Sequence, residues 1–416
     1  MLRNHSLATR LTVLAVVVTL VFGVAVVGLA GCSRATKKQG VKIGIPIPLS
    51  GSFGVYGEAM KQGTELAIKE INDAGGLLGN PVEVVYEDTQ EDTVQPAIDK
   101  VKSLIEKDKV DALVGIISSA SRDAVIPTIY RAKKVFIYPT TYEGGVAAKF
   151  QDRGAQYVFT TGPVSEQYIK PFIPWLVENK GTSFYLLGMD YIYGRGSITN
   201  AKQYIADAGG TVVGEEYPPL GTTDFSAILN RVAAAKPEVV FAVIAGDDLI
   251  YLAKQFHEFG LDTQGIAFAT SELDESYMQA LGPDVAAGIS CSYPYFMGVQ
   301  TPENTEFLAK MRAAYGDDVL VSLATESQYY SVWLYANAVK QAGTTDTDAV
   351  VKALETATFK APEGAITIRK ADHQAIVNDV IAEIVPDASK PYWQWFKIVQ
   401  RLEAIEPSLQ GDIYGQ

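Results

Sequence analysis

Cysteine and histidine are scarce in this sequence, and their scarcity limits the chemistry that the chain can support. The 416 residues include two cysteines and three histidines. His5, His257 and His373 lie far apart, and none has a partner at the spacing of a metal site or a catalytic triad. The G-x-S-x-G motif of many hydrolases is also absent. We therefore expect no enzyme, no metal and no other cofactor.

Positive charge is also in short supply. The chain has 35 lysines and arginines against 48 aspartates and glutamates, which gives a net charge of −13. A protein that binds nucleic acid needs a basic face to meet the phosphates. We therefore expect no nucleic-acid partner, and we expect the excess of acidic groups to favour solubility.

A long uncharged run occurs at the N-terminus. Arg3 and Arg10 provide a basic start, residues 11–30 carry no charge, and the run ends in L-A-G-C (29–32). A basic head, an apolar middle and small residues before a cut site are the pattern of a secretory signal peptide. The small residues before the cysteine also resemble the lipobox of bacterial lipoproteins.

This resemblance predicts a lipoprotein signal peptide over residues 1–31 and lipid on Cys32, followed by a polar tether over residues 32–40. The alternative is an uncleaved membrane anchor, because about twenty apolar residues can span a bilayer. Both interpretations export the rest of the chain. The first anchors it by lipid to the outer face of the cytoplasmic membrane, in the periplasm or at the cell surface.

Cys291 is then the one cysteine left for the folded part. It lies in an apolar, strand-like run over residues 288–292, which predicts buried packing rather than a reactive thiol. An exported chain with a single cysteine has no internal disulfide. It does not need one, because about 375 residues can bury a large core.

From residue 41 onward, short β-branched runs alternate with segments of helical periodicity. Residues 41–47 read as a strand and residues 57–73 as a helix that ends at two glycines. Strands that alternate with helices predict a parallel, doubly wound α/β sheet. The next elements are expected at 82–86, 111–117 and 135–138 for strands, and at 94–107 and from Ser121 for helices.

The same alternation restarts after residue 162, and nine or ten strands at this spacing are too many for one domain. Two α/β lobes are therefore expected. The second series has strands at 183–187, 211–217, 239–245 and 266–269, and helices at 166–178, 197–208, 225–235 and 248–259. The tail adds helices at 326–342 and 349–356 and strands at 365–368 and 375–385.

Eight segments in order resemble the type I periplasmic binding proteins, in the branch that binds branched-chain amino acids, urea and short amides. They are V-K-I-G-I-P-I-P-L-S-G (41–51), I-N-D-A-G-G-L-L-G-N-P-V (71–82), V-G-I-I-S-S-A-S (114–121), Y-P-T-T-Y-E-G-G (138–145), M-D-Y-I-Y-G-R-G (189–196), P-L-G-T-T-D-F-S (219–226), A-G-D-D (245–248) and T-E-S-Q-Y-Y-S-V-W-L-Y-A-N-A-V (325–339).

The resemblance implies two Rossmann-like lobes joined by a three-crossover hinge, with the ligand in the cleft between them. It places lobe one at residues 41–161 and 288–362 and lobe two at residues 162–287 and 363–416. It also implies an ABC permease in the cytoplasmic membrane as the partner. We expect the binding protein itself to be a monomer.

Polar residues that follow the strands of lobe one are the first candidates for the ligand site, because ligands bind beyond the carboxyl ends of such strands. Ser118 and Ser119 precede a helix, where hydroxyls and N–H groups can hold an oxygen of the ligand or simply cap the helix. The family motif implies that Thr140 and Tyr142 line the cleft. Tyr56, in a glycine-rich loop without the residues of a phosphate loop, is expected at the rim.

Lobe two should supply the other side of the site. Tyr191 and Tyr193 follow strand 183–187, and Asp247 follows strand 239–245. A carboxylate in the cleft can accept hydrogen bonds from an ammonium or an amide nitrogen, so Asp247 is expected as that acceptor unless it only caps its helix. Glu272 occupies the equivalent place after the next strand.

These positions suggest that lobe one donates to an oxygen end of the solute while lobe two accepts from a nitrogen end. P-T-T-Y-E-G (139–144) resembles the urea and amide binders, whereas Y-G-R-G (193–196) resembles the amino-acid binders. We expect a small polar solute, with urea or a short amide favoured. A branched-chain or other small amino acid is the alternative, as is a sensing role for a membrane receptor.

Overall fold

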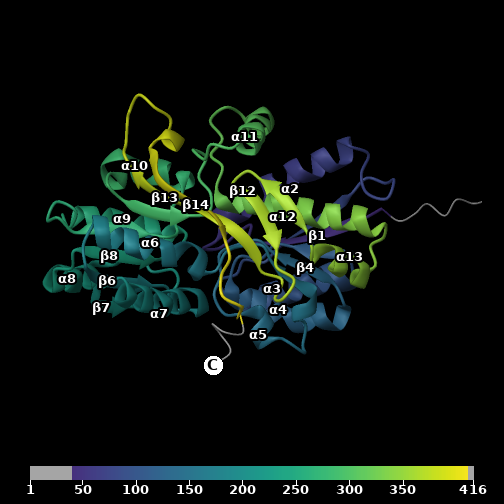
Figure 1. Ribbon diagram of the computed structural model, residues 1–416, viewed down its shortest axis with the longest axis horizontal. Coiled ribbons are helices and arrows are strands. Elements are labelled where there is room, and N and C mark those ends of the chain that lie inside the picture. The colour runs from purple at the N-terminus through teal and green to yellow at the C-terminus, as the bar shows by residue number, and fades with distance from the viewer. Residues whose placement is uncertain (1–39, 411–416) are drawn as a thin grey trace, which may run out of the picture. The chain divides into compact units, whose positions relative to one another are not determined.

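The computed structural model describes residues 40–410, which lie within one compact unit, Gly40–Gln416 (Figure 1). The expected signal peptide, Cys32 and the tether up to residue 39 lie outside the described residues. No helix within residues 40–410 combines the length and apolarity needed to cross a membrane.

The first sheet has five parallel strands in the order β2-β1-β3-β4-β5. Its central strands are apolar and buried, as expected for a sheet with helices on both faces. The order reverses beside β1, and such a reversal opens a crevice beyond the carboxyl ends of the strands. The strands are β1 Lys42–Ile47, β2 Glu83–Asp88, β3 Ala112–Val114, β4 Val135–Tyr138 and β5 Val158–Thr160.

Helices from two distant parts of the chain pack on this sheet. Helix α12 lies against α2, and a side chain at Gly63 of α2 would collide with the carbonyl oxygen of Thr325, so glycine permits the close approach (Figure 1). The helices are α2 Gly54–Asp73, α3 Val94–Glu106, α4 Ser119–Ala132, α5 Val146–Lys149, α12 Leu323–Ala342 and α13 Thr347–Leu354.

The second sheet has nine strands. They run in the order β11-β12-β13-β10-β9-β8-β6-β7, and β14 pairs with β13. The strands β6 to β10 pair in parallel, whereas β13 is antiparallel to β10, β12 and β14. The strands are β6 Ser183–Gly188, β7 Thr211–Glu216, β8 Val239–Val243, β9 Ala267–Thr270, β10 Ser290–Tyr293, β11 Thr358–Ala361, β12 Gly364–Ile368, β13 Ala375–Ile384 and β14 Phe396–Ile405.

The remaining helices follow the strands of this second sheet. Helices α6 and α7 pack on each other, as do α9 and α10. Pro171 and Pro174 are accommodated inside α6. The helices are α6 Ser165–Asn179, α7 Ile192–Asp207, α8 Ser226–Ala235, α9 Asp247–Glu258, α10 Met278–Ala286 and α11 Pro302–Tyr315, with short 3₁₀ turns η1 Ala155–Tyr157, η2 Glu275–Tyr277 and η3 Tyr392–Gln394.

The chain passes between the two sheets beside β5 and β13. Thr160, at the end of β5, forms a bridge with Gln374, just before β13, and its backbone N–H donates to the carbonyl of His373 at 3.0 Å. We expected the chain to return to lobe one near residue 288. However, β10 still pairs with β9 and β13, so the return comes after Tyr293. Cys291 is buried within β10, which confirms its expected packing role.

Candidate functional site

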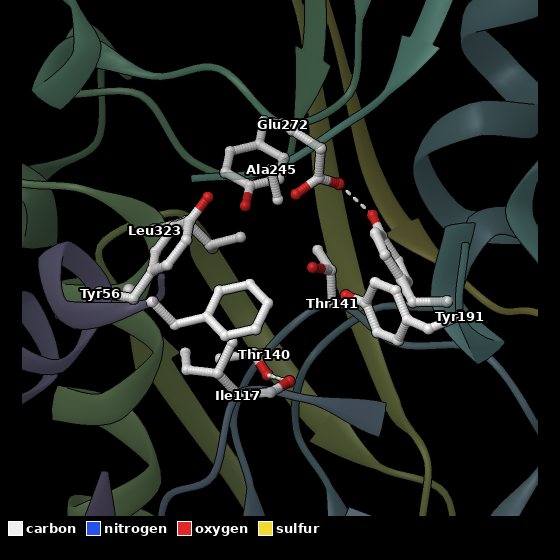
Figure 2. A pocket seen from close by; sticks show the side chains of 12 residues that line it. Tyr56, Ile117, Thr140, Thr141, Tyr191, Ala245, Glu272 and Leu323 are labelled. Carbon is white, nitrogen blue, oxygen red and sulfur yellow. Dashed lines mark hydrogen bonds between the residues drawn. The ribbon is translucent and has the colours of Figure 1, made fainter. Parts of the chain in front are cut away.

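A pocket of about 410 Å³, its open mouth included, lies beyond the carboxyl ends of the strands and is lined from both lobes (Figure 2). The pocket itself encloses a cavity of only about 30 Å³, below the usual range of small-molecule sites. We call it the cleft. Its walls are mainly aromatic and aliphatic, with a few polar groups among them. Within the described residues, no group of three histidines, cysteines or acids is placed to hold a metal ion.

Lobe one provides one wall of the cleft. Thr140 and Thr141 come after β4 and Pro139, and Ile117 comes after β3, at the same edge of the sheet. The Thr140 hydroxyl donates to the carbonyl oxygen of Ile117 at 3.2 Å, and Figure 2 shows Thr141 pointing toward the centre of the cleft. The rest of this wall consists of Phe53, Tyr56, Leu323 and Ala324, from the starts of α2 and α12.

The opposite wall comes from lobe two and holds Glu272, which follows β9 and is only 3% exposed. Figure 2 shows its carboxyl group on the far side of the cleft from Thr140 and Ile117. Burial away from water raises the pKa of Glu272 to about 8. Among the described residues that line the cleft, it is the only acid, and none is lysine, arginine or histidine.

Tyrosine hydroxyls hold this carboxyl group in place. Tyr193, near the start of α7, donates a hydrogen bond to Glu272 and shares another with the hydroxyl of Tyr168 at 2.7 Å. Burial raises the pKa of Tyr193 and of Tyr168 well above the ordinary value, so both stay neutral. The carboxyl group thus has one fixed hydrogen-bond donor and no cationic partner in the cleft wall.

Glu91 supports the lobe-one wall from behind. This buried carboxyl group accepts hydrogen bonds from the backbone of Ile117 and Ser118 and from the hydroxyl of Thr89. Burial is the main cause that raises its pKa to about 7, against the opposing effect of these donors. The loop that it fixes includes Ile116, which has a φ of 69°. Glu91 therefore holds the strained turn that presents Ile117 to the cleft.

Five of the nine predicted ligand-binding residues line the cleft. They are Tyr56, Thr140, Tyr191, Tyr193 and Glu272. Tyr191, Tyr193 and Glu272 were predicted because they follow strands, Thr140 was implied by the family motif, and Tyr56 was expected at the rim from its glycine-rich loop. The structure therefore brings together residues from four separate segments of the chain at one site.

The other four do not reach the cleft wall. Ser118 caps α4 by accepting from the backbone N–H groups of Ala120 and Ser121, at 3.2 and 3.3 Å. The buried Ser119 accepts from the backbone of Glu143, while Tyr142 is fully buried and bonds to Thr160, Gln374 and Gln410. Asp247 is exposed, in the first turn of α9. The acidic residue in the cleft lining is Glu272 and not Asp247.

Several residues that line the cleft were not predicted from the sequence. Tyr293 lies at the end of β10 and follows the same strand rule, but the boundary expected at residue 288 placed it in the wrong lobe. Thr141 stands next to a predicted residue. Leu323 and Ala324 come from the start of α12, and no local sequence motif indicates that they line the cleft.

The whole described fold matches one known family over nearly its full length. The family model of periplasmic binding proteins matches residues 40–389. The chain belongs to the periplasmic binding protein family. This confirms the resemblance found in the sequence and the expected two-lobe α/β fold.

Two curated relatives and one solved structure are similar to this chain over most of its length. A "Leu/Ile/Val-binding protein homolog 6" from Brucella melitensis is 26% identical over 89% of this chain and 93% of its own length. A "leucine-, isoleucine-, valine-, threonine-, and alanine-binding protein" from Pseudomonas aeruginosa is also 26% identical, over 82% of this chain and 88% of its own. A solute-binding protein of Rhodopseudomonas palustris, solved with 3,4-dihydroxybenzoic acid, superposes with a TM-score of 0.80 at 23% identity and covers 88% and 98% of the two chains.

These likenesses assign the chain to transport. The periplasmic binding protein is the solute-binding component of an ABC transporter, it works with the permease, and it is exported. The family is not a family of enzymes, in line with the lack of catalytic motifs in the sequence.

Proposed function

We propose that this binding protein captures a small amino acid and delivers it to the ABC permease. The observation that carries the proposal is Glu272, a buried carboxyl group that faces the cleft without a cationic partner among the described residues that line it. A buried carboxylate is strongly stabilised by a cation that replaces its lost water. The α-ammonium group of an amino acid supplies that cation.

The opposite wall suits the other end of the same solute. Thr141 carries a hydroxyl that can donate to a carboxylate, and the Thr140 hydroxyl can do so by giving up its bond to the carbonyl of Ile117. Both lie across the cleft from Glu272 (Figure 2). An amino acid with its ammonium at Glu272 and its carboxylate at the threonines ties lobe two to lobe one. This is the arrangement of a donor side and an acceptor side that was expected from the sequence, with Glu272 in place of Asp247.

The rest of the cleft favours an apolar side chain on the solute. Phe53, Tyr191 and Tyr293 give flat apolar surfaces around the polar groups. The names of the Brucella and Pseudomonas relatives refer to amino acids, most of them with aliphatic side chains. Leucine, isoleucine, valine and alanine are therefore the first solutes to test.

Two other solute classes fit the cleft less well. Urea and short amides, which were favoured from P-T-T-Y-E-G (139–144), can bond to Glu272 but carry no cation that would stabilise its ionised form. An aromatic acid, such as the one bound by the Rhodopseudomonas protein, suits the aromatic walls. It would bring a negative charge to a cleft whose described lining holds no cation.

A thermal-shift panel on residues 40–416, freed of bound solute by unfolding and refolding, tests the proposal. The panel holds leucine, isoleucine, valine, alanine, urea, acetamide and 4-hydroxybenzoate. Solute at a thousand times its Kd stabilises the fold by about 4 kcal/mol. We expect an aliphatic amino acid to raise Tm by several degrees, and the variant Glu272→Gln to lose most of that shift.

The other outcomes separate the alternatives. A shift with urea or acetamide alone, retained by Glu272→Gln, supports the amide prediction and contradicts the ammonium at Glu272. A shift with the aromatic acid alone contradicts both. The variant Tyr251→Phe, changed at an exposed tyrosine of α9 outside the cleft lining, serves as a control and should shift as the unaltered protein does.

We also propose that the protein is held at the membrane by lipid on Cys32, from the small-small-cysteine pattern at residues 30–32. Incorporation of a labelled fatty acid into the full chain, lost in Cys32→Ser, would support this anchor. Absence of label in the unaltered chain would contradict it.

A further inference from the structure

Two tyrosine hydroxyls join the lobes at the edge of the cleft without any solute between them. Tyr56 belongs to α2 of lobe one, and Tyr277 ends η2 of lobe two. Their oxygens are 2.5 Å apart. The backbone N–H of Gly246, at the start of α9, donates toward both oxygens, at 3.2 Å from Tyr56 and 3.0 Å from Tyr277. We call these three residues the tyrosine latch.

The latch is sheltered from water. Tyr56 is 8% exposed and Tyr277 3% exposed. Burial raises the pKa of both phenols well above the ordinary value, so both hydroxyls keep their protons and can donate. Hydrogen bonds in such surroundings do not compete with water while the lobes are together, and they are exchanged for bonds to water when the lobes separate.

The backbone at Gly246 is shaped for this contact. Its φ of 67° and ψ of −149° fall in a region that is essentially open to glycine alone. A side chain there would also lie 2.9 Å from the carbonyl oxygen of Ser52, in the loop that precedes α2 of lobe one. Glycine thus permits the two lobes to approach at the point where the N–H group reaches the hydroxyls.

We propose that the tyrosine latch stabilises the closed lobes directly, independently of which solute is bound. Tyr277 is a positioning residue in this role, because it does not line the cleft but bonds to Tyr56, which does. Closure requires interactions that are present in the closed state and absent in the open one. The latch supplies such interactions from the protein, so the solute needs to contribute less.

The variant Tyr277→Phe tests this inference, with Tyr251→Phe as the matched control. Rates of binding and release are measured by stopped-flow for each solute that binds residues 40–416. A net contribution of about 0.5–1.5 kcal/mol for a lost hydrogen bond corresponds to roughly a two- to tenfold change. We expect Tyr277→Phe to raise the release rate by this factor, leave the binding rate unchanged, and do so equally for every solute.

A release rate equal to that of the unaltered protein would overturn the inference, and so would a factor that differs between solutes. A purely structural role of Tyr277 predicts a lower Tm with unchanged release. If the panel yields no solute, which would defeat the proposed function, X-ray scattering of the unliganded proteins decides. A larger radius of gyration for Tyr277→Phe than for Tyr251→Phe supports the latch, and identical curves contradict it.

Discussion

At the scale of single residues, the protonation of Glu272 couples binding to pH. Burial raises the pKa of this carboxyl group to about 8, so in the empty cleft it is mainly protonated at neutral pH. Binding of an ammonium group requires the carboxylate, and each unit of pH below the pKa therefore costs the solute about 1.4 kcal/mol. A neutral amide that binds through its carbonyl instead needs the protonated carboxyl group as a donor, so its affinity should fall as the pH rises through this pKa.

This coupling gives a prediction for affinity. Between pH 5.5 and 7, we expect the Kd for the amino acid to fall about tenfold per pH unit, since one unit of pH is worth a factor of ten. Isothermal titration calorimetry across this range measures it. In Glu272→Gln the remaining weak binding should not depend on pH. A constant Kd in the unaltered protein would show that Glu272 does not meet a charged group.

At the scale of helices and strands, two polar residues that follow neighbouring strands have different roles. Ser118 caps helix α4, whereas Thr140 lines the cleft. Ser118 accepts from two backbone N–H groups of this helix and does not line the cleft. Loss of such a cap costs about 1 kcal/mol. Thr140, which follows the next strand, does line the cleft.

We therefore expect Ser118→Ala to lower Tm by roughly 2–4 °C, the usual effect of 1 kcal/mol in a large domain. Its Kd should stay within a factor of two of the unaltered protein. Thr140→Val should show the opposite pattern, with a weaker Kd and a smaller change in Tm. If Ser118→Ala instead weakens binding at unchanged Tm, the ligand role expected from the sequence is the correct one.

Most strands and helices could be predicted because their apolar periodicity is strong. Residues 135–138 form a strand at the predicted bounds, and the helix predicted at 326–342 exists as α12, three residues longer. The strand β14 was missed because most of it is only partly buried or exposed and it carries charges, so its apolar pattern is weak. Helix α4 continues through Pro127, although a proline in a helix interior removes a hydrogen bond and tends to bend the helix.

Part of the cleft could also be predicted, because the strands themselves can be recognised from their apolar pattern. Residues that follow strands, such as Thr140 and Glu272, can be located from the strand pattern and the sheet-edge rule. The choice between Asp247 and Glu272 could not be made, because both follow strands and only the tertiary packing turns one outward. Leu323 reaches the cleft through the packing of α12 on α2, a contact between distant segments.

At the scale of the whole molecule, buried acids make the fold depend on pH. Burial raises the pKa of Glu91 to about 7 and that of Glu272, Glu363 and Asp379 to about 8. Glu363 also accepts from Asn378, and the carbonyl of Glu363 accepts from Arg401. A carboxyl group with a raised pKa in the folded state stabilises the fold fully below its unfolded pKa, and this contribution is lost as the pH rises through the folded value.

We therefore expect the unliganded protein to have a larger free energy of unfolding at pH 5 than at pH 8, as measured by urea denaturation. His373 has the opposite effect on the pH dependence of the free energy of unfolding, because burial lowers its pKa. We expect the four carboxyl groups named above to outweigh this single imidazole. Carboxyl groups with a lowered pKa, such as Glu216, act below about pH 4.5 and do not enter this window. Equal stability at the two pH values would contradict the protonated state of these acids.

The central claim is that one solute joins the two lobes through its ammonium and carboxylate ends. A crystal structure of residues 40–416 with the solute that gives the largest thermal shift tests it most directly. The account predicts a nitrogen of the solute within hydrogen-bond distance of Glu272 and an oxygen within the same distance of Thr140 or Thr141. A solute that leaves Glu272 bonded to Tyr193 alone, or that binds outside the cleft, would contradict it.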